Sequence, residues 1–162
     1  MPQQLAICLT INGQPCAGHV SPRLLLSDFL REHVGLTGVR VCCEQGICGA
    51  CTILVDGQTA RACLLLAVQA DGADILTVEG LGQPRTLHPL QQAFWDHHGL
   101  QCGYCTPGML ITAYELLSRN PDPSETEVRE AIAGNICRCT GYVHIVTSIQ
   151  AAAQAMQSGG SR

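Results

Sequence analysis

The sequence predicts an α+β domain followed by an all-α domain, with the change near residue 80. Two observations carry this prediction: β-hairpin signals dominate the first 80 residues, and helical periodicity dominates the rest. The 162 residues are enough for two small domains, 1–80 and 81–162, and the 46% hydrophobic content supports a core in each. A short segment rich in glycine and proline, Gly80–Pro84, is the predicted connector.

The first predicted element is a strand over Leu5–Ile11, in which alternate residues are apolar. Asn12-Gly13 is the strongest short hairpin signal, and it predicts a return strand over 14–20. Ser21-Pro22 then predicts a helix that ends near Gly35, because serine is a good N-cap and proline suits the first helical position. This first part of the chain is therefore expected to be a hairpin crossed by one helix.

A loop rich in glycine and cysteine follows over 38–51. Beyond it the sequence predicts a second hairpin around Asp56-Gly57, with strands over 52–55 and 59–64, and a closing strand over 75–78. Two hairpins, one helix and a late strand make a small α+β domain.

The second predicted domain consists of four helices with short connections, which is typical of a helix bundle. They are expected over 87–98, from Thr106-Pro107 to Asn120, from a Ser124/Glu127 capping box to Gly134, and along a final stripe of Ile145, Ile149, Ala152 and Met156. Ser158–Arg162 is predicted to be a frayed tail.

Composition excludes several classes of function. The net charge is −4 and all nine basic residues are scattered arginines, so no basic surface for nucleic acid is expected. The longest apolar run, Ala62–Val68, is far shorter than the roughly 20 residues that a membrane helix needs. Met1–Gln4 shows no basic region before an apolar stretch, and we therefore expect a cytoplasmic protein.

Cysteine is the most informative residue type. The chain has 11 cysteines, an odd number, and no export signal, which disfavours a disulfide framework. In a reducing compartment, grouped cysteines more often bind metal or carry out redox chemistry.

The first cysteine group has the order C-x4-C-x2-C, followed by one more cysteine, and consists of Cys43, Cys48, Cys51 and Cys63. This is the plant-type spacing of a [2Fe–2S] cluster held by four thiolates. Gly46 and Gly49 would allow the loop to fold tightly around the cluster. Zinc is the alternative, but zinc sites favour two C-x2–4-C pairs, whereas Cys63 is predicted to lie alone in a strand.

The second group consists of Cys102, Cys105, Cys137 and Cys139. Their spacing alone does not distinguish a zinc site from an iron–sulfur site. Cys105 and Cys139 each precede a predicted helix start, where free N–H groups and a partial positive charge favour an anionic thiolate cluster. Arg138 either adds to this positive field or is a solvated surface residue.

Three cysteines fall outside both groups. Cys42 is adjacent to Cys43, but only Cys43 gives the x4 spacing to Cys48. Cys42, together with Cys8 and Cys16 of the first hairpin, is predicted to be a buried structural thiol.

Four segments together resemble the small iron–sulfur subunit of the molybdenum hydroxylases, the xanthine oxidase family, in its bacterial three-subunit form. They are Cys43–Thr52, Arg61–Leu64, Gln101–Gly108 and Gly134–Tyr142. The resemblance covers roughly residues 4–155. It implies an N-terminal β-grasp, plant-type ferredoxin-like domain and a C-terminal four-helix-bundle domain, each with one [2Fe–2S] cluster. Cys42 departs from the family, which often has glycine there.

The resemblance also implies partners and cofactor contacts. The chain is expected to relay electrons from a large molybdenum-binding subunit to FAD in a medium subunit, in a dimer of heterotrimers. Gln101 and Cys139 are expected to contact the molybdopterin, in its cytosine dinucleotide form, and no residue is expected to act on the organic substrate. Two alternatives remain open: a free-standing ferredoxin-like carrier and a zinc-stabilised interaction module. The 14% charged content favours a subunit, because a diffusing carrier would have a more highly charged surface.

Overall fold

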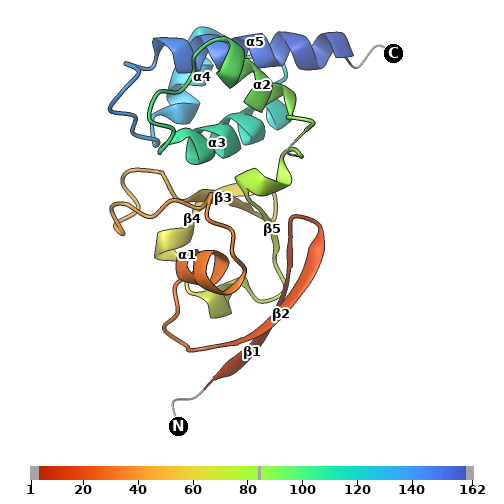
Figure 1. Cartoon of the computed structure of the whole chain (residues 1–162), viewed down its shortest axis with the longest axis vertical. Coiled ribbons are helices and arrows are strands. Elements are labelled where there is room, and N and C mark those ends of the chain that lie inside the picture. The colour runs from red at the N-terminus through yellow and green to blue at the C-terminus, as the bar shows by residue number, and fades with distance from the viewer. Residues whose placement is uncertain (1–3, 84, 160–162) are drawn as a thin grey trace.

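A mixed five-stranded sheet lies at one end of the molecule and helices α2–α5 lie at the other (Figure 1). The computed structural model describes residues 4–83 and 85–159. The predicted α+β class is confirmed. Among the described residues, no helix has the length and apolar character that crossing a bilayer requires.

The sheet has the strand order β2-β1-β5-β3-β4. β1 and β5 run parallel, whereas β1/β2, β3/β4 and β3/β5 are antiparallel pairs. The strands are β1 (Leu5–Ile11), β2 (Gln14–Val20), β3 (Thr52–Val55), β4 (Gln58–Arg61) and β5 (Asp74–Leu76).

Both predicted hairpin turns are present. Asn12-Gly13 has φ values of 51° and 75°, and Asp56-Gly57 has φ values of 50° and 80°. Positive φ at both central residues is the geometry that matches the twist of the flanking strands. The alternation predicted for β1 is also present, since Ile7, Leu9 and Ile11 are buried.

The first helix begins later than the sequence predicts. α1 (Leu26–Asp28) is one turn long and continues as a π-helical segment to His33, whereas Ser21-Pro22 forms a turn. The cause is tertiary: Leu25 pairs with Leu66 as an isolated bridge, and the Leu26 N–H donates to the Leu65 carbonyl at 2.7 Å. This pairing holds Leu25 extended, so the helix begins only at Leu26.

Two strand predictions need correction. β4 ends at Arg61, and residues 62–64 form a 3₁₀ turn, so Cys63 does not lie in a strand. β5 spans 74–76 rather than 75–78, because the Thr77 N–H donates to the Asn12 side chain at 2.8 Å and a 3₁₀ turn begins at Val78.

The four C-terminal helices agree with the prediction in number and order among the described residues. They are α2 (Pro89–Asp96), α3 (Thr106–Arg119), α4 (Glu125–Ile132) and α5 (Val143–Gly159). α2 is shorter than predicted, because His88 is its N-cap and accepts from the Leu90 N–H. The predicted Ser124/Glu127 capping box is confirmed. The tail prediction is wrong for 158–159, which belong to α5, and its other residues, 160–162, lie outside the described part.

Each half of the molecule has its own hydrophobic cluster. Leu26, Phe29 and Leu30 pack onto one face of the sheet, and residues of α2, α3, α4 and α5 share the second cluster. α3 lies directly against β3, so the two halves are in contact along this helix (Figure 1).

Candidate metal centres

The β3–β4 hairpin brings the fourth cysteine of the first group next to the third. Thr52 pairs with Arg61 in the antiparallel register, and just beyond that pair the Ala62 N–H donates to the Cys51 carbonyl at 3.3 Å. Cys51 and Cys63 are therefore neighbours although 12 positions separate them, and both are buried.

The loop before β3 wraps around the Cys43 sulfur. Gly46 and Gly49 have φ values of +74° and +72°, which confirms the glycine prediction. The backbone N–H groups of Gln45 and Cys48 each donate to the Cys43 Sγ at 3.4 Å. These hydrogen bonds lower the pKa of Cys43 to about 6, so this sulfur is readily anionic, as a metal ligand must be.

Two other thiols of this group, Cys48 and Cys51, are less easily ionised without a metal. Burial raises the pKa of Cys48, and it raises the pKa of Cys51 to about 11. Cys48 interacts with Cys43, and Cys51 interacts most strongly with Cys63 and more weakly with Cys48, so the sulfurs lie close together with two main pairs. Metal binding at this site would displace the remaining protons.

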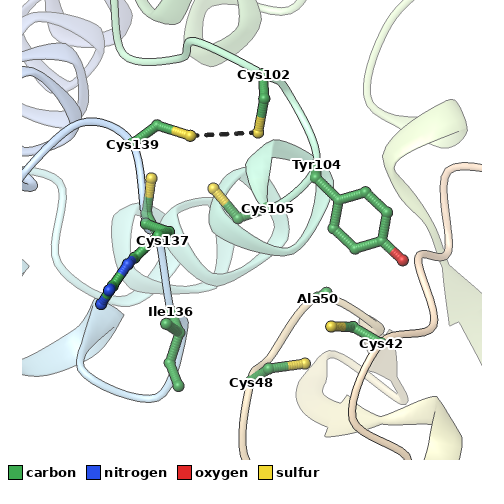
Figure 2. Close-up of a pocket in the computed structure, with 10 residues that line it drawn as sticks. Cys42, Cys48, Ala50, Cys102, Tyr104, Cys105, Ile136, Cys137 and Cys139 are labelled. Atoms are coloured by element: carbon green, nitrogen blue, oxygen red, sulfur yellow. Dashed lines mark hydrogen bonds between the residues drawn. The ribbon is translucent and has the colours of Figure 1, made fainter.

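The second group forms where two loops of the helical half meet (Figure 2). Cys102 and Cys105 precede α3, and Cys137 and Cys139 lie between α4 and α5. The sulfurs of Cys102 and Cys139 are 3.4 Å apart, and Cys105 interacts with Cys137. All four predicted ligands are thus together, again as two pairs.

The helix-start prediction is confirmed for Cys105 and wrong for Cys139. Cys105 is the N-cap of α3, whereas α5 begins only at Val143, after residues with φ values of +63° and +70° at Gly141 and Tyr142. Burial raises the pKa of Cys105 to about 12. Burial also opposes ionisation of Cys137, but hydrogen bonds led by that of the Thr140 hydroxyl outweigh it and lower the Cys137 pKa.

The pairwise arrangement fits a two-iron cluster. A [2Fe–2S] cluster takes four thiolates, two on each iron. The sulfurs of Cys102 and Cys139 are 3.4 Å apart, and the strongest interaction of Cys51 with another thiol is with Cys63. Next to Cys105, the Thr106 hydroxyl is buried without a partner in the described part of the chain, and a cluster sulfur would supply an acceptor.

One cavity joins the two groups. It has a volume of about 220 Å³, and its lining includes Cys48 of the first group together with all four cysteines of the second. Figure 2 shows Cys48 and Ala50 facing the second group across this space, with Tyr104 and Ile136 at its sides. The two candidate centres are therefore adjacent.

The prediction that the remaining cysteines are buried is wrong for two of them. Cys8 is exposed, because the alternation of β1 turns Ile7 and Leu9 to the core and places Cys8 on the opposite face. Cys42 is also exposed and lines the cavity between the groups, and Cys16 is half-buried.

The other predicted site residues lie at the surface of the second group. Gln101 is exposed beside Cys102, and Arg138 lines the cavity. Sequence reasoning missed a set of polar contacts between the two halves, made by Arg61, Tyr104 and Asn135. Each lies inside or beside a cysteine motif, which is the only signal that the sequence offers for them.

Two family models match the chain. A "2Fe-2S iron-sulfur cluster binding domain" matches residues 9–76, and a "[2Fe-2S] binding domain" matches residues 77–150. Each match covers one of the two cysteine groups.

Several characterised proteins are similar over most of the chain. The gamma subunit of caffeine dehydrogenase from Pseudomonas sp. (strain CBB1) is 53% identical over 147 residues, which cover 89% of this chain and 88% of that subunit. The small subunit of nicotine 6-hydroxylase from Paenarthrobacter nicotinovorans is 51% identical over 146 residues, covering 90% and 88%. Among solved structures, quinoline 2-oxidoreductase from Pseudomonas putida 86 matches with a TM-score of 0.93 and 55% identity, over 97% of this chain and 98% of that one.

Proposed function

The chain belongs to the small [2Fe–2S] subunits of molybdenum hydroxylase and dehydrogenase complexes, and from this membership we propose that it relays electrons between two partner subunits. The electrons come from the molybdopterin cofactor of a large subunit, and their acceptor is FAD in a medium subunit. The chain is an electron-transfer component of an oxidoreductase and does not act on the organic substrate itself.

The pairing of the cysteine sulfurs carries the ligand assignment. Cys43 with Cys48, and Cys51 with Cys63, would each hold one iron of the first cluster. Cys102 with Cys139, and Cys105 with Cys137, would do the same for the second. Each bound [2Fe–2S] cluster supplies a one-electron redox centre. The backbone donors around Cys43 and the Thr140 hydroxyl at Cys137 stabilise the anionic sulfurs.

The two halves serve as separate cluster domains. We assign 1–80 to a ferredoxin-like domain of β-grasp type and 81–162 to a helical domain, in which α2–α5 form the four-helix bundle. The division is supported by the two hydrophobic clusters, one around the sheet and one among the helices.

The positions of the exposed ligands support the order that we propose for the relay. Cys102 and Cys139 are exposed next to Gln101, so this edge is open to the large subunit, with Gln101 and Cys139 toward the pterin in its cytosine dinucleotide form. Electrons then pass across the shared cavity to the group of Cys43 and Cys48. The Ile47 side chain beside that group is 61% exposed, which suits a contact with the flavin subunit. The complete assembly is proposed to be a dimer of heterotrimers.

Metal analysis of the purified full chain tests the cluster assignment. The expected result is four irons and four acid-labile sulfides per chain, with two distinct paramagnetic signals after reduction, since one site lies in a loop and the other at a helix start. Zinc in stoichiometric amounts would refute iron–sulfur and support the interaction module. Purification without partner subunits from the native organism would support the free carrier.

A matched pair of variants tests the choice between adjacent cysteines. Cys43→Ser should lose the first signal and two irons, whereas Cys42→Ser should keep all four irons. The reverse result would make Cys42 the ligand.

A further inference from the structure

The Asn135 side chain connects the two candidate centres. It is 2% exposed, and its amide Nδ2 donates to the Gly49 carbonyl at 3.0 Å and to the Thr52 hydroxyl at 3.2 Å. Its Oδ1 accepts from the Thr112 hydroxyl of α3 at 3.0 Å. Gly49 follows the ligand Cys48, and Asn135 stands two positions before the ligand Cys137. One buried amide therefore holds a loop of each cysteine group.

Arg61 adds a second connection at the same junction. Its Nη1 donates to the Thr52 hydroxyl at 2.6 Å, and its Nη2 donates to the Gly134 carbonyl at 2.7 Å. The Ile136 N–H also donates to the Cys48 carbonyl at 2.8 Å. The loop of the second group is thus bonded at three consecutive positions, 134–136, to the ferredoxin-like half.

The backbones at this junction are in close contact. A Cβ added at Gly49 would lie under 3.0 Å from the Gly134 carbonyl oxygen, and one added at Gly108 would lie under 3.0 Å from the Gly49 carbonyl oxygen. Because backbone atoms occupy the space on both sides of Gly49, the two loops cannot slide past each other without breaking hydrogen bonds.

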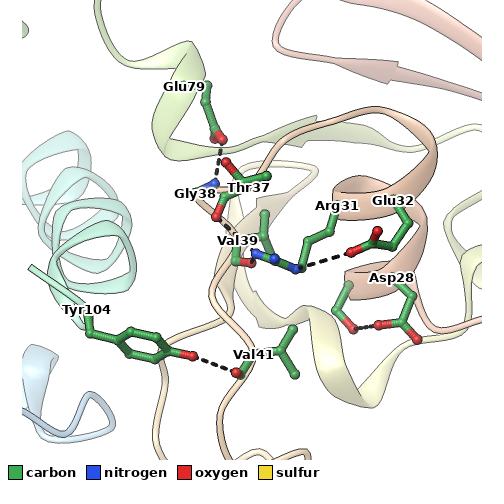
Figure 3. Close-up of polar contacts among 10 residues, drawn as sticks. Asp28, Arg31, Glu32, Thr37, Gly38, Val39, Val41, Glu79 and Tyr104 are labelled. Carbon is green, nitrogen blue, oxygen red and sulfur yellow. Dashed lines mark hydrogen bonds and ion pairs between the residues drawn. The ribbon is translucent and has the colours of Figure 1, made fainter.

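Tyr104 makes a separate connection on the other side of the cavity. Its hydroxyl donates to the Val41 carbonyl at 2.6 Å, as Figure 3 shows, and the Arg40 guanidinium lies 5.9 Å from the ring centroid. Tyr104 lies between the ligands Cys102 and Cys105, and Val41 lies two positions before Cys43. The cavity between the groups is therefore bridged on two sides.

We propose that Asn135, supported by Arg61 and Tyr104, is a positioning residue that fixes the distance and orientation between the two clusters. This proposal rests on the proposed function, since it requires a cluster at each group. Electron tunnelling slows exponentially with distance, and the magnetic coupling of two reduced clusters falls with the cube of their distance. A junction that fixes the separation therefore sets both quantities, without contacting either partner subunit's cofactor.

The test uses the complex with its full chain, reduced by dithionite so that both clusters are paramagnetic. Asn135→Ala removes all three amide hydrogen bonds, and Asn135→Asp keeps the Oδ1 acceptor but removes the donor to Gly49 and Thr52. Asn120→Ala is the matched control, because the Asn120 side chain donates to the exposed Glu127 side chain and accepts from the Asp122 N–H, away from both groups. Iron content, the signal of each cluster and the spin–spin splitting between them are measured for every variant.

The expected result is a loss or marked change of the splitting in both Asn135 variants, with four irons retained, and an unchanged splitting in Asn120→Ala. An unchanged splitting in Asn135→Ala with four irons would overturn the proposal. If Asn135→Ala fails to fold, Tyr104→Phe decides: it keeps the half-exposed ring beside Arg40 and removes only the hydrogen bond to Val41. A reduced splitting there supports the junction, and an unchanged one overturns it. A wild-type chain without two iron signals would refute the proposed function instead.

Discussion

Alanine at position 108 should destabilise the protein although helix propensity predicts the opposite. Gly108 lies in the first turn of α3, and replacing glycine by alanine in a helix normally stabilises by about 1 kcal/mol. Here the new Cβ would lie under 3.0 Å from the Gly49 carbonyl oxygen. That oxygen is held in place by the Asn135 amide at 3.0 Å and by the Thr52 hydroxyl and N–H.

The Gly49 carbonyl must move to relieve the clash, and this movement weakens the hydrogen bonds that it accepts. Overpacking costs about 1–3 kcal/mol, and a weakened hydrogen bond costs about 0.5–1.5 kcal/mol more. After the gain in helix propensity is subtracted from these costs, we expect Gly108→Ala to lower the free energy of unfolding by about 1–3 kcal/mol. Thermal unfolding of the cluster-loaded full chain, followed by far-UV circular dichroism, measures this loss.

Ser118→Ala is the matched control in the same helix. Ser118 is exposed and its hydroxyl donates only to the Tyr114 carbonyl one turn earlier, so its removal should change stability by no more than about 0.5 kcal/mol. Equal or higher stability of Gly108→Ala relative to this control would refute the close contact between α3 and the loop of the first group.

Three further predictions concern other sites. Hydrogen bonds from Ser124 hold the pKa of Glu127 below its ordinary 4.5, so the ionised Glu127 stabilises the fold above pH 4.5 and this stabilisation is lost as pH falls through the folded pKa. Glu127→Gln should therefore flatten the acid side of a plot of unfolding free energy against pH. Burial lowers the pKa of His88 below 6.5, so the unfolded chain binds the proton more tightly and the free energy of unfolding falls as pH drops below 6.5. His88→Asn keeps an N-cap residue and should remove this pH dependence when unfolding by urea is measured at several pH values. Gln101→Ala in the assembled complex should keep four irons and lower turnover or molybdenum content, since a lost hydrogen bond costs about 0.5–1.5 kcal/mol; unchanged values would exclude Gln101 from the pterin contact.

The sequence predicts the structure correctly where that structure depends on residues close together in the chain. Asn12-Gly13 and the Ser124/Glu127 box form as predicted, because turn and cap geometry are decided within a few positions. The division of the eight cysteines into two groups also agrees with the structure, because each group lies within one half of the chain.

Errors occurred where long-range contacts override local preference. Ser21-Pro22 has the side chains that favour a helix start, but the pairing of Leu25 with Leu66 holds Leu25 extended and delays the helix to Leu26. Asn135 belongs to a cysteine motif, but nothing in the sequence shows that its amide meets the Gly49 carbonyl, 86 positions away. Cys42 was predicted to be buried because cysteine usually is, yet it lines an open cavity between the groups.

Rapid-reaction kinetics of a Cys48→Ser variant in the assembled complex test the central claim of an ordered relay. The complex is mixed with an oxidisable substrate that the wild-type enzyme turns over, and reduction of each cluster and of FAD is followed by freeze-quench spectroscopy. With the first cluster lost or crippled, we predict fast reduction of the cluster held by Cys102, Cys105, Cys137 and Cys139 and stalled reduction of FAD. Fast FAD reduction with that cluster still oxidised would contradict the proposed order.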